Sequence, residues 1–159
     1  MNLQWQTRRF DALQVRQLYQ LLQFRQAVFI VEQCCAYQDL DDYDLESMHL
    51  LAHEVHSGEL LAYARCLPPG IKYQESSIGR VAVARNHRGK GLGHELVRRS
   101  IDCCNLWRPE TQVLSHDIRI SAQAYLIDFY SQHGFSPRGD VYLEDGIKHQ
   151  DMLRQASFP

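Results

Sequence analysis

Three glycines at alternate positions, Gly89, Gly91 and Gly93, follow a β-branched run and precede an amphipathic segment. A strand, a glycine loop and a helix in this order direct several free backbone N–H groups and the positive end of a helix dipole at one point. Such a point binds phosphate, and glycine lets the backbone approach the anion without a Cβ in the way. Arg88 and Lys90 add positive charge. These residues predict a binding loop for a phosphate, most naturally a pyrophosphate.

The loop differs from the two commonest phosphate loops. A Walker loop requires Gly-x4-Gly-Lys-Ser/Thr, and a Rossmann loop requires Gly-x-Gly-x-x-Gly near the first strand. The pattern here is Arg88-x-x-Gly91-x-Gly93, midway along the chain. It resembles the acetyl-CoA pyrophosphate loop of the GNAT acyltransferase family. A glycine-rich turn that merely begins a helix is the alternative.

A second pattern lies near the C-terminus, where apolar residues at helical spacing precede Gly134, a residue suited to the left-handed position after a helix. The string Phe129-Tyr130-x-x-x-Gly134-Phe135 resembles the GNAT helix whose tyrosine lies beside the CoA sulfur. It follows one helix and one short strand, which is the order that the family requires. A half-buried core tyrosine is the alternative for Tyr130, but two motifs in the right order favour the family.

The resemblance is to the ElaA branch of that family and runs from about Trp5 to Met152. It is carried by the segments Phe24–Gln33, Tyr37–Asp41, Ala62–Arg65, Ile78–Val81 and Glu144–His149. The chain departs from the pattern at Cys34–Ala36, at Lys148 and at Arg108–His116. These departures concern the shapes of loops rather than the fold.

The resemblance implies acetyl transfer from acetyl-CoA, as cosubstrate, to an amine acceptor by direct attack in a ternary complex. Backbone N–H groups of Val81–Val83 would align the pantetheine arm, Val83 would polarise the thioester carbonyl, and Tyr130 would be the general acid. The residues expected to bind the cofactor are Val81, Ala82, Val83, Arg88, Gly89, Lys90, Gly91, Leu92, Gly93, Gln123 and Tyr130.

The general base is left open among three residues. An alkyl amine has a solution pKa of about 10.4, so it must lose a proton before it attacks. Glu32, Glu144 and His149 lie in ElaA-like segments and could accept that proton directly or through water. Each has a structural alternative: Glu32 in a helix-end ion pair, Glu144 in a turn, His149 on a strand surface. No metal is expected.

These residues must be positioned by one α/β (α+β) domain spanning residues 1–159. Hydrophobic periodicity predicts strands at 3–8, 50–55, 60–67, 76–83, 118–121, 141–144 and 149–153. It predicts helices from an Asp11 cap to about Arg25, from the glycine loop to about Leu106, and around Tyr130. The first helix is expected to carry Val15, Leu18, Leu21, Leu22 and Arg25 on one face. The result is a mixed, mostly antiparallel sheet of six to seven strands flanked by about four helices, which in the GNAT fold splays near residues 76–83.

The bulk properties exclude several classes of protein. A net charge of −2 argues against an electrostatically driven nucleic-acid binder. The chain has no run of 18 apolar residues and no apolar leader, so we expect a cytoplasmic protein without a membrane partner. The five cysteines include the adjacent pairs Cys34–Cys35 and Cys103–Cys104, and we expect all five to be reduced, with Cys66 buried.

Two charged clusters are open to two interpretations each. The basic cluster suits either the 3′-phosphate of CoA or a solvated helix face; its members are Arg80, Arg85, Arg88, Lys90, Arg98 and Arg99. The acidic tract is either an attractor for a cationic acceptor, such as a polyamine, an amino sugar or a lysine, or a solvated loop. It consists of Asp39, Asp41, Asp42, Asp44 and Glu46.

The sequence leaves three other functions open: a non-catalytic acyl-CoA-binding module, an acyltransferase for longer acyl chains, and a structural or partner-binding domain. The acceptor is a small-molecule or peptide amine of unknown identity. A homodimer is consistent with the family.

Overall fold

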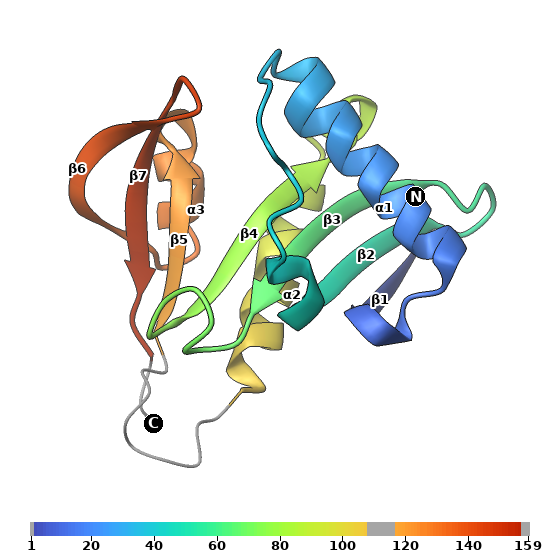
Figure 1. The fold of residues 1–159 in the computed structure, drawn as a ribbon, viewed down its shortest axis with the longest axis horizontal. Helices are drawn as coiled ribbons and strands as arrows, with labels where there is room; N and C mark the ends of the chain where they lie inside the picture. The colour runs from blue at the N-terminus through green and yellow to red at the C-terminus, as the bar shows by residue number, and fades with distance from the viewer. Residues whose placement is uncertain (1, 108–116, 157–159) are drawn as a thin grey trace.

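The computed structural model describes residues 2–107 and 117–156 of the 159-residue chain. Seven strands form one mixed sheet in the order β1-β2-β3-β4-β5-β7-β6 (Figure 1). The strands are β1 (Leu3–Arg9), β2 (Met48–Glu54), β3 (Leu60–Leu67), β4 (Ser76–Val83), β5 (Ile118–Gln123), β6 (Ser136–Glu144) and β7 (Ile147–Arg154). All neighbouring pairs are antiparallel except β4 and β5. The expected mixed, mostly antiparallel sheet is confirmed.

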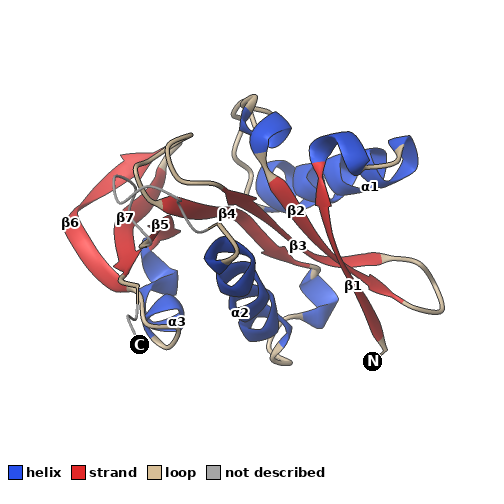
Figure 2. Ribbon diagram, turned by 90° about the horizontal axis from the view of Figure 1, so that it is seen from below, coloured by secondary structure: helices blue, strands red, loops and turns tan. Residues whose placement is uncertain are grey.

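Helices α1 (Val15–Arg25) and α2 (Leu92–Asn105) cover opposite faces of the sheet formed by β1–β4 (Figure 2). Because side chains alternate along a strand, β2 and β3 supply both cores. Leu51 and Tyr63 pack with Leu21 under α1, while Leu50 and its neighbours pack under α2 with Leu96. Both faces of these strands are therefore buried, which explains their nearly continuous apolar sequence.

The described residues form three α-helices rather than about four, the third being α3 (Ile127–Ser131). Helix α1 is preceded by a 3₁₀ turn and capped by Gln14, whose backbone N–H donates to Gln17 Oε1 at 3.1 Å. The prediction of Asp11 as the cap is therefore wrong. Val15, which shares the predicted face with the leucines, is exposed at the first position of the helix. Periodicity does not reveal where along a helix the sheet begins to cover it.

The chain continues beyond α1 as a π-helical segment, η2 (Gln26–Glu32), in place of the expected helix end near Arg25. Just after it, the backbone N–H of Cys35 donates to the carbonyl of Ile30, five residues earlier, at 3.2 Å. The wider turn changes which side chains face the sheet, and π-helical turns are frequent at functional sites.

Strands β4 and β5 pair only at Ser76 with Ile118 and at Ser77 with Arg119. Beyond these two pairs the strands diverge, which agrees with the expected splaying of the sheet near residues 76–83. Strands β5, β7 and β6 therefore form a second arm, with α3 against it (Figures 1 and 2). Strand β4 also carries a bulge opposite β3, where Arg80 has a φ of 53°.

A closed ring of six alternating charges joins α1, β3, β4 and the acidic tract. Its members, in order around the ring, are Arg25, Asp39, Arg80, Asp41, Arg65 and Asp44, which again contacts Arg25. The fully buried Arg25 donates from Nε to Asp39 at 2.8 Å and from Nη1 to Asp44 at 2.7 Å. Arg65 is 2% exposed and donates through both Nη atoms to Asp41, at 2.5 and 2.8 Å.

The charges of the ring balance, so that each arginine faces two carboxylates. Burial alone would raise the pKa of Asp39, but the hydrogen bond and charge of Arg25, together with Arg80, hold that pKa below its usual range. The tract is therefore not the solvated loop considered above, and its buried members Asp39 and Asp44 are not free to attract a cationic acceptor. Its short helix, Tyr43–Glu46, precedes β2 directly.

No helix among residues 2–107 and 117–156 has both the length and the hydropathy needed to cross a membrane.

Replacing Arg25 with methionine should strongly destabilise the fold. Removing one partner from a buried ionic group leaves uncompensated charge and costs about 3–5 kcal/mol. We expect a loss of that size in the free energy of unfolding, measured by urea denaturation. The matched control is Arg16→Met on the exposed side of the same helix, expected to change stability by less than about 0.5 kcal/mol. Equal effects of the two substitutions would show that the ring does not stabilise the fold.

Candidate active site

A cavity of about 890 Å³ lies where β4 and β5 diverge. Its lining contains most of the residues singled out in the sequence and brings together segments from the whole chain. The predicted site residues that line it are Glu32, Val81, Ala82, Val83, Arg88, Gly89, Gly91, Gly93, Gln123, Tyr130, Glu144 and His149. Two predicted cofactor-binding residues do not line it. The Lys90 ammonium donates to the Asn86 carbonyl at 3.0 Å, and the Leu92 side chain is buried in the core.

The glycine loop opens α2 at the edge of the cavity. Gly91 is the N-cap, with a φ of 84°, and the first backbone bond of the helix runs from Glu95 N–H to the Gly91 carbonyl at 3.2 Å. The amides of residues 92–94 precede that bond and have no acceptor within the helix. Because a Cβ on Gly91 would also strain the left-handed backbone, this position favours glycine. The arrangement suits an anion at the helix N-terminus.

The free edge of β4 faces the cavity near its end. Ala84 N–H donates to the Leu61 carbonyl of β3 at 2.8 Å. Because successive peptide groups of a strand point to opposite edges, the N–H of Val83 should point away from β3, toward the cavity. The carbonyl of Val83 agrees, since it accepts a bond from Arg88 Nε at 2.9 Å. Val83 can therefore offer a backbone donor to a ligand.

Arg88 spans the space between this strand and η2. Its guanidinium pairs with both carboxylate oxygens of Glu32, Nη2 to Oε2 at 3.0 Å. The hydrogen bond and charge of Arg88 lower the pKa of Glu32. A carboxylate that is so occupied and so acidic is a poor general base, so the ion-pair alternative describes Glu32 best.

Arg98 and Arg99, the last two members of the basic cluster, do not line the cavity. Arg98 and Arg99 both pair with Glu95 on α2, at 2.8 and 2.6 Å, and Arg98 also contacts Asp102. Arg80 belongs to the ring of charges. Arg98 and Arg99 therefore belong to a network of charges on the helix surface rather than to a phosphate site.

Tyr130 lies on α3 and is 7% exposed. The helix is shorter than expected and follows a 3₁₀ turn at Ala124–Leu126, but Gly134 has the predicted left-handed backbone, with a φ of 83°. Edge-on contacts with Phe129 and Phe135 fix the ring, at centroid distances of 5.1 and 6.0 Å. Burial raises the pKa of Tyr130, so the hydroxyl keeps its proton at neutral pH.

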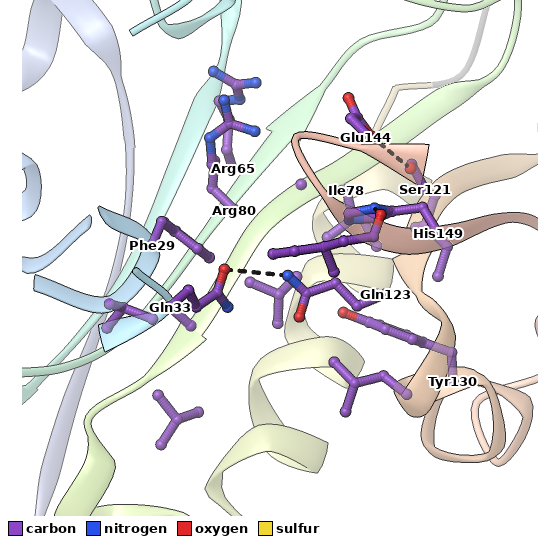
Figure 3. Close-up of a pocket in the computed structure, with 18 of the residues that line it drawn as sticks. Phe29, Gln33, Arg65, Ile78, Arg80, Ser121, Gln123, Tyr130, Glu144 and His149 are labelled. Atoms are coloured by element: carbon purple, nitrogen blue, oxygen red, sulfur yellow. Dashed lines mark hydrogen bonds between the residues drawn. The ribbon is translucent and has the colours of Figure 1, made fainter. Parts of the chain in front are cut away.

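Gln123 and Gln33 form a bridge across the cavity, Nε2 to Oε1 at 3.2 Å. Figure 3 shows Tyr130 on one side of this bridge and Ser121, Glu144 and His149 on the other. A second bridge runs from the Cys35 thiol to the Asp145 carbonyl at 3.2 Å. The cavity thus has a compartment near the glycine loop and Tyr130, and a second one lined by polar groups of the β5–β7 arm.

His149 is oriented by its own strand. Its Nδ1 lies 2.9 Å from the Ile147 carbonyl. A carbonyl only accepts hydrogen bonds, so Nδ1 carries the proton in the neutral ring and Nε2 keeps a free lone pair. His149 is therefore chemically able to act as a base.

Sequence reasoning missed several residues of the lining. Phe29 and Gln33 enter it from the π-helical segment, Arg65 from β3, and Ser121 from β5. One usable signal was Arg25, a charged residue on an otherwise apolar face of the predicted helix, which implies buried acidic partners elsewhere in the chain. The segment Arg108–His116 lies outside the described residues.

In the part of the chain that the structure describes, no group of three or more histidine, cysteine, aspartate or glutamate side chains is arranged to hold a metal ion. All five cysteines are free, and Cys66 is buried as expected.

Comparisons with known proteins agree with this geometry. A family model described as "Acetyltransferase (GNAT) domain" matches residues 16–155. Protein ElaA of Escherichia coli (strain K12) is 41% identical over 155 residues, covering 96% of this chain and 97% of that protein. The crystal structure of Escherichia coli ElaA matches with a TM-score of 0.86 at 39% identity, covering 97% of this chain and 100% of that one. The crystal structure of an acyl-CoA N-acyltransferase from Pseudomonas aeruginosa matches with a TM-score of 0.86 at 39% identity, covering 96% and 99%.

Proposed function

Because the chain belongs to the GNAT family of acyltransferases, we propose that it transfers an acetyl group from acetyl-CoA to an amine by direct attack in a ternary complex. One observation carries the proposal. The glycine loop, the free edge of β4 and the Tyr130 side chain all meet in one cavity, as a thioester cofactor requires. The acceptor is a small-molecule or peptide amine.

The binding of acetyl-CoA follows from the unpaired backbone groups. Its pyrophosphate binds the amides of the loop, from Arg88 to Gly93, at the positive end of α2. Its pantetheine arm runs along the edge of β4 at residues 81–83 and takes the place of a neighbouring strand. Arg88 can bind the phosphates if its guanidinium gives up the ion pair with Glu32.

The acetyl transfer needs a polarised carbonyl and two proton movements. Val83 N–H binds the thioester oxygen and stabilises the negative charge that develops there. Tyr130 donates a proton to the departing thiolate, whose pKa of about 8.5 is that of an ordinary thiol. Glu144 and His149, beyond the Gln33–Gln123 bridge, remain as candidates to take a proton from the amine. Holding both substrates in one cavity supplies much of the acceleration.

Acetyl-CoA should stabilise the folded protein. At about 100 times its dissociation constant, a ligand of the native state adds about 2.7 kcal/mol to the free energy of unfolding. We expect a raised thermal midpoint with acetyl-CoA and with CoA, and little change with ATP. No shift at millimolar acetyl-CoA would refute the proposed function.

Replacing Gly91 with alanine should weaken acetyl-CoA binding and cost about 1–2 kcal/mol of stability, because alanine is strained in the left-handed region. Gly58→Ala is the matched control, since Gly58 has a φ of 70° in the β2–β3 turn and similarly open surroundings. Urea denaturation should show a similar loss for both variants, and calorimetric titration with acetyl-CoA a loss of affinity for Gly91→Ala alone. Equal affinity in the two variants would argue against the loop as the binding site.

Replacing Tyr130 with phenylalanine should lower kcat by about 100-fold and leave the dissociation constant of acetyl-CoA unchanged. Because burial raises the pKa of Tyr130, wild-type kcat should not fall from loss of this proton below about pH 10. The measurement is kcat across pH with an amine found by screening, and Tyr19→Phe on the exposed side of α1 is the control. Unchanged kcat would exclude Tyr130 as the acid, and binding of acetyl-CoA without turnover in the wild type would favour the non-catalytic module.

A further inference from the structure

Four side chains of the β5–β7 arm form a hydrogen-bonded chain that ends in a carboxylate on each side. Ser121 Oγ lies 2.5 Å from Tyr142 Oη and 3.3 Å from Glu144 Oε2. Tyr142 Oη lies 2.9 Å from Asp151 Oδ1. Ser121 and Glu144 line the cavity, and the other two groups stand behind them. Figure 3 shows the contact between Ser121 and Glu144, on the side of the Gln33–Gln123 bridge that lies away from Tyr130.

The hydrogen-bonded chain of these four side chains is one proton short of three complete hydrogen bonds. With both carboxylates ionised, the two hydroxyls of Ser121 and Tyr142 supply two protons for three contacts. One of the three contacts must then bring two oxygen lone pairs together. A third proton on a carboxylate would complete all three hydrogen bonds, so the geometry favours uptake of a proton.

The surrounding charges indicate where the third proton rests. Arg119 Nη1 lies 3.4 Å from Asp151 Oδ2 and favours the ionised form of that carboxylate. His149 stacks on the Tyr142 ring, and Lys72 and Tyr73 face the cluster from the segment before β4. The charge of Lys72 favours the ionised form of Glu144 through a longer-range interaction, whereas Arg119 pairs directly with Asp151 and also with Glu75. With Asp151 ionised, the bonds run from a protonated Glu144 to Ser121, from Ser121 to Tyr142, and from Tyr142 to Asp151.

We propose that Glu144 is the general base of the acetyl transfer, and that Ser121, Tyr142 and Asp151 are positioning residues that hold the proton it accepts. The inference rests on the proposed function. The ammonium of the acceptor gives one proton to Glu144, and the lone pair that this leaves on nitrogen forms the C–N bond. The C–S bond breaks and its electron pair passes to sulfur. Tyr130 gives its proton to the thiolate, the second proton lost by the nitrogen restores Tyr130, and the proton on Glu144 returns to water.

The test compares two probe amines in the wild type, Glu144→Gln and Tyr142→Phe. Ethylamine is charged at neutral pH and must lose a proton, whereas methoxyamine is already neutral. With ethylamine, Glu144→Gln should lose at least 100-fold in kcat/KM and Tyr142→Phe about tenfold, while both keep most of the methoxyamine rate. The acid limb of the ethylamine profile should move to lower pH in Tyr142→Phe, because the contact that only the third proton satisfies is gone.

A titration of ¹³C-labelled glutamate and aspartate carboxylates by NMR tests the cluster without any acceptor. The Glu144 signal, assigned by its absence in Glu144→Gln, should titrate at lower pH in Tyr142→Phe than in the wild type. Tyr19→Phe is the control and should change neither the titration nor the rates. An unchanged titration in Tyr142→Phe, or equal losses with both amines, would overturn the inference. Failure to bind acetyl-CoA would instead refute the proposed function, and the titration would still decide whether the cluster holds the proton.

Discussion

Strand β4 has a neighbouring strand along the whole of one edge and along only two residues of the other. A peptide group that is buried without a partner costs about 1–3 kcal/mol, so the free edge must meet water or a ligand. Every other feature of the site depends on this separation. If β4 and β5 paired along their full length, Val83 N–H would bond to β5, and Tyr130 would have no space in front of it. The same separation places the glycine loop at the mouth of the opening, because the loop follows β4 directly.

The ring of six charges explains how the separated arms keep a defined spacing. One wall of the cavity consists of η2 and the segment with the acidic tract, which follow α1 in the chain. Arg25, Arg65 and Arg80 reach this wall from a helix and from two adjacent strands, and each binds two carboxylates. Hydrogen bonds are directional, so the ring fixes orientation as well as proximity. Buried ion pairs often add little net stability, and we attribute to this ring mainly the geometry of the wall.

The parts of the fold that could be predicted are those with a local signal. Short apolar runs, with a turn at residues 56–58 between the first two, identified the β2–β3 hairpin and β4, and the glycine spacing identified the start of α2. The charge ring had no such signal, because its members lie between 14 and 41 positions apart in the pairs that they form. A run of acidic residues is usually solvated, and only the long-range contacts overturn that expectation. The cap at Gln14 and the π-helical segment were missed because both depend on hydrogen bonds between particular atoms rather than on hydrophobic period.

In the proposed reaction the two arms divide the chemistry between them. The β4 side offers fixed dipoles, in the form of backbone N–H groups and the end of α2, which suit the phosphates and the thioester oxygen. The β5–β7 arm carries the groups that can exchange protons, with Tyr130 on one side of the Gln33–Gln123 bridge and Glu144 on the other. This division follows from solvation. In the proposed reaction Tyr130 must hold its proton until sulfur departs, and its burial, which raises its pKa, favours this. A base must release its proton after each turnover, and Glu144 is itself exposed, so in the proposed reaction its proton can pass to water.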